Sequence, residues 1–85
     1  MMKTIKNNMT DIKDSAEYLI KAVVNDDSQV SLESREENGI IILDIIAPSE
    51  IVGQIIGKEG KIIKSIRTLL NLSFPNTHYL LQIKE

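Results

Sequence analysis

The chain has no cysteine, no tryptophan, one histidine and only three residues of tyrosine or phenylalanine in 85 positions. Without cysteine, neither a disulfide framework nor a thiolate metal site can form. The single histidine, His78, leaves little for acid–base or metal chemistry. We therefore expect a protein that is not an enzyme and that holds no metal or cofactor. The few aromatic rings also argue against a nucleic-acid binder that stacks bases on aromatic platforms.

Long apolar segments are absent as well. No run approaches the ~20 residues that span a bilayer, and Met1 to Lys6 contains no apolar signal-peptide core. We expect a cytoplasmic protein without a membrane partner. With 42% hydrophobic residues the chain can build one small globular domain, and its thin core would gain from oligomerisation.

A strong excess of positive charge is also missing, because the net charge is -2. This value alone would argue against a nucleic-acid partner, but the charge is unevenly distributed. Residues 1–50 carry five Lys/Arg against ten Asp/Glu, whereas residues 51–85 carry five against two. Four basic residues fall within ten positions: Lys58, Lys61, Lys64 and Arg67. On composition alone, an ordinary solvated helix face would explain this cluster.

Hydrophobic periodicity predicts an alternation of helices and strands. After a flexible tail over residues 1–9, Thr10 suits the N-cap of a helix that ends near Asn25. Strand patterns follow over residues 30–35 and 40–46, joined by an Asn-Gly hairpin turn. Pro48 then favours the start of a short helix over residues 51–56.

The last third of the chain continues this alternation. Gly57 ends the short helix, a further helix covers residues 61–72, and a strand covers residues 79–84. The predicted order is helix, strand, strand, helix, helix, strand. We therefore expect a single α+β domain over residues 10–85, with the helices packed on one face of a three-stranded sheet.

Two glycines three positions apart, Gly57 and Gly60, separate the two later helices. The residues around them exclude two common phosphate-binding loops. A P-loop needs four residues between its glycines and Ser or Thr after its lysine, but Gly53 and Gly57 enclose three and Glu59 follows Lys58. A dinucleotide-binding loop would need glycine in place of Ile55.

Three interpretations of Gly57 and Gly60 remain. In a G-x-x-G clamp, the missing side chains let a sugar-phosphate chain approach the backbone, and the following helix presents free N–H groups to a phosphate. Alternatively, Gly57 only caps one helix and Gly60 relieves the turn into the next. A helix-turn-helix DNA reader also joins two helices by such a turn, but usually within a helical bundle.

The stretch from Val52 to Arg67, VGQIIGKEGKIIKSIR, resembles the signature of a KH domain: I-I-G-x-x-G, followed two positions later by an aliphatic residue. A helix and two strands precede it, which is similar to the type II, bacterial form of the KH fold. The chain length, the opening helix, Ala47-Pro48 and the segment from Ser65 to Leu69 resemble the KhpA family of small stand-alone KH proteins. The resemblance runs from about Asp11 to the C-terminus.

This resemblance implies single-stranded RNA in a groove beside the glycine loop, with about four nucleotides clamped. It implies that Gly57 and Gly60 allow close approach, that Lys58 meets phosphate and that Ile56 contributes to an apolar groove floor. Ile45 and Ile46 would supply the groove wall or belong simply to the core. The candidate RNA-binding residues are Ile56, Gly57, Lys58, Glu59, Gly60, Lys61, Lys64 and Arg67.

An association surface is also expected on the last helix. Leu69 lies at the edge of its apolar arc and Leu72 about 60° further round, so with Phe74 they would form an apolar patch unless another element covers them. The resemblance implies a homodimer, or a heteromer with a larger KhpB-like KH protein.

We therefore expect an RNA chaperone or post-transcriptional regulator, which the resemblance links in some bacteria to cell shape. The alternative is a protein interaction module on a KH fold with weak or no RNA binding.

Overall fold

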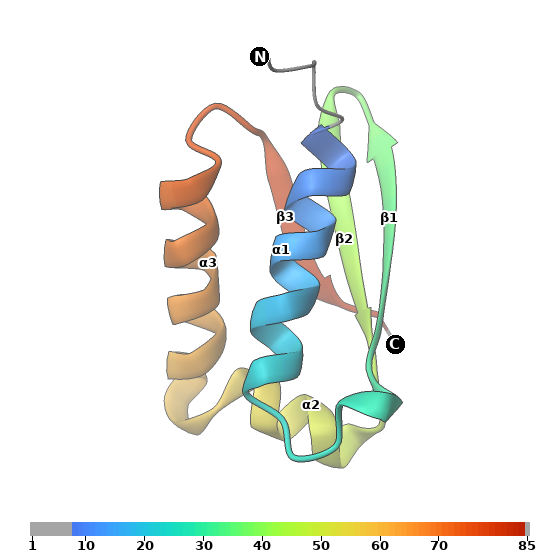
Figure 1. Cartoon of the computed structure of the whole chain (residues 1–85), viewed down its shortest axis with the longest axis vertical. Helices are drawn as coiled ribbons and strands as arrows, with labels where there is room; N and C mark the ends of the chain where they lie inside the picture. The colour runs from blue at the N-terminus through green and yellow to red at the C-terminus, as the bar shows by residue number, and fades with distance from the viewer. Residues whose placement is uncertain (1–7, 85) are drawn as a thin grey trace, which may run out of the picture.

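The computed structural model describes residues 8–84 and has the predicted order of elements (Figure 1). Two short 3-10 turns, η1 and η2, join the main elements. The elements are α1 (Asn8–Ala22), η1 (Asp27–Gln29), β1 (Ser31–Glu37), β2 (Ile40–Ile46), α2 (Ser49–Ile56), η2 (Lys58–Gly60), α3 (Lys61–Ser73) and β3 (Tyr79–Ile83). From residue 8 to residue 84, no helix combines the length and the hydropathy needed to cross a membrane.

The sheet has the order β1-β2-β3, with β2 in the centre. β1 and β2 pair antiparallel through a two-residue turn whose members, Asn38 and Gly39, both have positive φ. This is the turn geometry for which the Asn-Gly sequence is favoured. β2 and β3 pair in parallel, from Ile41 opposite Tyr79 to Ile45 opposite Ile83, so the chain must cross over between them. α2, the glycine loop and α3 make this crossover.

The core lies between the sheet and the helices that cover one of its faces (Figure 1). β2 is buried over five consecutive residues, as expected for a central strand. α1 contributes a stripe at i, i+4 and i+8 that has no exposed surface: Ile12, Ala16 and Ile20. α3 contributes Ile63, Ile66 and Leu70 at the same kind of spacing.

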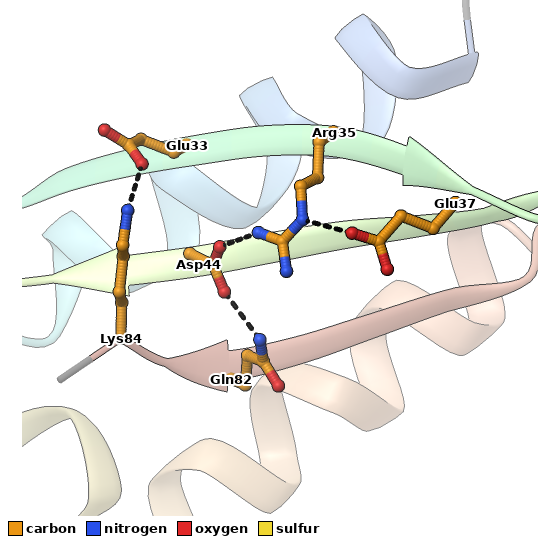
Figure 2. Close-up of polar contacts among 6 residues, drawn as sticks. All are labelled: Glu33, Arg35, Glu37, Asp44, Gln82 and Lys84. Carbon is orange, nitrogen blue, oxygen red and sulfur yellow. Dashed lines mark hydrogen bonds and ion pairs between the residues drawn. The ribbon is translucent and has the colours of Figure 1, made fainter.

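The opposite face of the sheet carries a polar network in place of a covering helix (Figure 2). Asp44 lies at the centre of this network and is only 2% exposed. It accepts a hydrogen bond of 2.7 Å from Gln82 Nε2 and forms an ion pair with Arg35. The Gln82 hydrogen bond first, and then Arg35, lower the pKa of Asp44 against the opposing effect of burial. Lys84 and Glu33 form a neighbouring ion pair at 2.9 Å.

Three helix boundaries differ from the sequence prediction. α1 begins at Asn8, so Thr10 lies inside its first turn and is not the N-cap; residues 1–7, the rest of the predicted tail, lie outside the described residues. α1 also ends at Ala22 and not near Asn25, because the Asn25 N–H donates to Gln54 Oε1 at 2.8 Å and draws the chain onto α2. α2 begins at Ser49 with extended Pro48 before it, two residues earlier than expected.

Candidate nucleic-acid interface

Gly57 ends α2 in a conformation that is almost exclusive to glycine, with φ 76° and ψ 176°. Its N–H donates to the Gly53 carbonyl at 2.9 Å and closes the last turn of the helix. A Cβ at this position would lie 2.8 Å from Cβ of Ile62. The fold therefore requires glycine here whatever the loop binds.

Gly60 precedes α3 in the left-handed conformation, with φ 75° and ψ 15°. A Cβ here would meet only Lys64 Cε, at 3.9 Å, so the surroundings of Gly60 are open. Glu59, between the two glycines, also has a positive φ of 58°. Capping and turning thus account for both glycines, and the chemistry of a ligand site must come from the groups around them.

The loop between the glycines presents backbone donors at the start of α3. The N–H groups of Gly60 and Lys61 bond to the carbonyls of Gly57 and Lys58 within the loop. For the N–H groups of Lys58 and Glu59, the described residues supply no acceptor, and both residues are exposed. Such donors at the positive end of a helix dipole favour an anion.

Basic side chains surround these donors. Lys58, Lys64 and Arg67 form no ion pair with any residue between 8 and 84. Lys61 Nζ is 3.9 Å from Glu59 Oε1, and because both side chains are exposed this pair holds the lysine only weakly. The stem of Lys64 reaches back toward Gly60. The loop therefore offers several cations to a phosphate.

Arg67 is held at the sheet, not on a purely solvated helix face. Its Nη2 donates to the Leu81 carbonyl at 3.2 Å. The Tyr79 hydroxyl lies 2.7 Å from Asn71 Oδ1 and 3.2 Å from the Arg67 carbonyl, which ties β3 to α3 a second time. Burial raises the pKa of Tyr79, and the charge of Arg67 opposes this shift.

β3 is an edge strand whose outer side faces this region. Its even-numbered residues bond to β2, since the Ile41 N–H donates to the His78 carbonyl and the Lys84 N–H donates to the Ile45 carbonyl, both at 2.9 Å. The alternate residues therefore direct their backbone N–H and C=O groups away from β2. These residues are Tyr79, Leu81 and Ile83.

A hollow of about 260 Å³ lies between α2 and β3. It is lined by Ala47, Ser49, Val52, Ile83 and Lys84. Val52 precedes Ile56 by one helical turn, so one face of α2 leads from the hollow toward the glycine loop. The sequence prediction identified half-buried Ile56 but missed Val52 and Ile83. The i, i+4 spacing to Ile56 could have indicated Val52, whereas Ile83 depends on the parallel pairing of β3.

The two isoleucines suggested as a groove wall do not line this hollow. Ile45 has no exposed surface and belongs to the core, as the simpler interpretation held. Ile46 follows Asp44 by two residues and therefore lies on the sheet face that the helices leave uncovered. β3 forms the wall in their place.

Two of the three residues expected to form an apolar patch on α3 are exposed. Leu69 is 47% exposed and Leu72 is 74% exposed, whereas Phe74 is half-buried against the core. Leu69 lines a groove of about 350 Å³ between α1 and α3 and also borders a second one of about 400 Å³ beside Tyr18. We call the surface around these two grooves, with the exposed Leu72 three residues further along α3, the α1/α3 face; its groove-lining apolar residues include Tyr18, Leu19, Val23 and Leu69.

One helix, an antiparallel strand pair, two helices joined by a glycine loop and a parallel third strand make up the type II KH fold. A family model described as KhpA/KhpB, KH domain, matches residues 13–78. The chain belongs to this KhpA/KhpB family of KH domains.

Curated relatives agree with this assignment. The chain is 37% identical over 68 residues to the RNA-binding protein KhpA of Treponema pallidum (strain Nichols), covering 78% of this chain and 85% of that protein. It is 39% identical over 59 residues to the RNA-binding protein KhpA of Chlamydia caviae, covering 69% and 76%. The RNA-binding protein KhpA of Thermotoga maritima is 33% identical over 60 residues, covering 71% and 80%. No solved structure gives a significant match.

Proposed function

We propose that the chain is a non-enzymatic RNA-binding protein that holds about four nucleotides of a single strand across the glycine loop and the hollow between α2 and β3. The observation that carries this proposal is the loop itself. Unpartnered backbone donors and the cations Lys58 and Lys64 lie at one end of an apolar face of α2. Family membership, and the names of relatives called RNA-binding proteins, support it.

The chemistry of the groove suits a single strand better than a duplex. Phosphates would meet the loop, where charge and N–H donors gather. An unpaired base would enter the hollow against Val52 and Ile83, where the outward N–H and C=O of Ile83 can bond to a base edge. The bases of a duplex are paired and stacked, so a duplex could not place a base in the hollow.

A loop variant tests this proposal. Replacing both Lys58 and Glu59 with aspartate leaves the two glycines intact and sets negative charge against the phosphate path. Lys13→Asp, on α1, makes the same change in net charge away from the loop. By fluorescence anisotropy with a short single-stranded RNA, we expect the loop variant to lose at least tenfold in affinity and the control to change little. A folded loop variant with wild-type affinity would overturn the clamp.

We further propose that the protein acts in the cytoplasm as an RNA chaperone or post-transcriptional regulator, with the link to cell shape that its resemblance to the KhpA family implies. In this role, two copies of the chain would associate through the α1/α3 face, or one copy would associate through it with a larger KhpB-like KH protein. Exposed Leu69 and Leu72 support this use of the surface.

The second candidate function is a protein interaction module with weak or no RNA binding. The apolar α1/α3 face favours it, because this surface alone would suffice for such a role. RNA crosslinking in cells separates the two. Bound RNA that disappears in the loop variant supports the RNA-binding proposal, whereas no crosslinked RNA with a retained protein partner supports the module.

A further inference from the structure

Arg67 differs from the other basic residues of α3 because its own chain already fixes its guanidinium. One Nη2–H group is bonded to the Leu81 carbonyl at 3.2 Å, on the outer edge of β3. The link between Tyr79 and Asn71 holds the same part of α3 against the strand. An arginine fixed in this way has lost much of its rotamer freedom before any ligand arrives, so ordering it on binding costs less.

The remaining donors of Arg67 are open to a ligand. A guanidinium has five N–H groups in a planar fork, and one of them is used by Leu81. No carboxylate of residues 8–84 forms an ion pair with Arg67, and the residue is exposed. The fork is therefore held in place and still able to form a bidentate contact.

The fork lies away from the glycine loop, where the phosphates would bind. Arg67 follows Gly60 by seven residues, which is roughly 10 Å along α3 from the glycine loop. Its anchor, Leu81, precedes Ile83 on the same strand edge by two residues, or roughly 7 Å. A strand whose phosphates lie at the loop and whose base enters the hollow beside Ile83 would bring a neighbouring base to Arg67.

We propose that Arg67 is a specificity-determining residue that reads guanine in the nucleotide next to the hollow. The inference rests on the RNA-binding function proposed above. The Hoogsteen edge of guanine presents two adjacent acceptors, O6 and N7, which match the arginine fork in a bidentate contact. Lys58 and Lys64 contact the phosphates. Arg67 therefore supplies sequence preference and contributes little to the salt dependence of binding.

The test uses the full chain and single-stranded oligouridine of eight nucleotides in which one uridine is replaced by guanosine, inosine, adenosine or 7-deazaguanosine. We expect guanosine and inosine, which share O6 and N7, to bind at least fivefold more tightly than adenosine or 7-deazaguanosine at one position. Arg67→Lys keeps the charge but loses the fork. It should remove this preference while its affinity for plain oligouridine stays within about threefold and its salt slope is unchanged.

Two control variants separate base reading from other roles. Lys64→Ala should weaken binding to every oligonucleotide, reduce the magnitude of the log-log salt slope by about 0.7 and leave the guanine preference in place. Tyr79→Phe removes the hydroxyl link between β3 and α3 but leaves the bond between Arg67 and the Leu81 carbonyl, so it should weaken the guanine preference at most slightly.

The outcomes that overturn the proposal are distinct from failure of RNA binding itself. If Arg67→Lys keeps the guanine preference while Arg67→Ala behaves like Lys64→Ala, Arg67 contacts phosphate and the assignment is wrong. If the wild type binds RNA with no guanine preference, the assignment of Arg67 is wrong and the proposed function stands. If the wild type binds none of the oligonucleotides, the proposed function falls and this inference falls with it.

Discussion

Gly57 and Gly60 belong to the same loop, but the structure constrains them differently. At Gly57 both the backbone conformation and Ile62 exclude a side chain, whereas at Gly60 only the left-handed backbone disfavours one. A loss of RNA binding after mutation of Gly57 would therefore report a damaged fold as much as a damaged site. Gly60 is the better position for separating the two.

The first prediction concerns these two glycines. Gly60→Ala should lower the free energy of unfolding by about 1 to 2 kcal/mol, the cost of the left-handed conformation for a residue with a Cβ. Gly57→Ala should cost about 3 kcal/mol or more, because the clash with Ile62 adds to a harsher backbone penalty. Urea unfolding measures both values. Equal stability of the two variants would contradict this account of the loop.

The second prediction concerns Asp44, which contacts Arg35 and Gln82 (Figure 2). Its pKa is lowered in the folded protein. A carboxyl group of this kind contributes stability above its unfolded pKa of about 3.9, and the contribution is lost as the pH falls through the lower folded pKa. Asp44→Asn should therefore be less stable than the wild type by about 1–3 kcal/mol at pH 7. The difference should shrink in strongly acidic solution.

The matched control for Asp44 is the exposed pair of Lys84 and Glu33 on the same sheet face. Glu33→Gln should change the stability by less than about 1 kcal/mol, as is usual for surface pairs. Thermal unfolding between pH 2.5 and pH 7 gives both comparisons. A wild-type advantage over Asp44→Asn that is the same at both ends of this range would show that the carboxylate charge is not responsible.

At the scale of elements, hydrophobic periodicity was enough to predict the order of helices and strands. The apolar stripe of α3 and the β-branched run of β2 are strong local patterns, and the structure has both segments within a residue or so of the predicted bounds. The end of α1 was predicted about three residues late, and just beyond it the Asn25 N–H bonds to Gln54, a partner 29 residues away. Hydrophobic periodicity within a short segment cannot identify a hydrogen-bond partner so far away in the sequence.

The candidate site was only partly predictable for the same reason. The glycine loop and its lysines are contiguous in sequence, so they were found together. The hollow needs Val52 and Ile83 side by side, which follows only from the parallel pairing of β3 with β2. The partner of Asp44, Gln82, is 38 residues away, and the anchor of Arg67 also lies on β3.

The third prediction belongs to the start of α3, where the cations of the loop and helix gather. Three phosphates neutralised on a single strand give a log-log dependence of affinity on salt with a slope of about -2. Affinity should therefore be modest and should fall only moderately between low and high salt. A slope near zero would contradict the electrostatic role of Lys58, Lys61 and Lys64. A preference for duplex DNA over RNA would instead favour the helix-turn-helix interpretation.

At the scale of the whole molecule, the small size of the domain gives a reason for association. One clamp of about four nucleotides offers little affinity, and two linked clamps raise the effective concentration of the second contact. The α1/α3 face lies on the helices, whereas the hollow lies between α2 and β3. The hollow shares no lining residue with the two grooves of the α1/α3 face, so a dimer could leave the hollow of each copy open, although Lys61 at the start of α3 lines one of these grooves.

The fourth prediction is that Leu69→Glu yields a monomer with weakened RNA binding. Leu80 is a matched control, because it is also 47% exposed but lies on the polar face of the sheet. Leu80→Glu should leave the association state unchanged. Sedimentation equilibrium at tens of micromolar measures it, and a wild type that is already monomeric there would leave the KhpB-like heteromer as the remaining form of the proposal.

The most direct test of the central claim is an NMR titration of the 15N-labelled chain with a short single-stranded RNA. If RNA lies across the glycine loop and the hollow, the amide signals of Lys58, Glu59, Gly60, Val52 and Ile83 should shift together and give one dissociation constant. The α1/α3 face and the polar sheet face should shift little. Shifts confined to either of those faces, or no shifts at saturating RNA, would contradict the account.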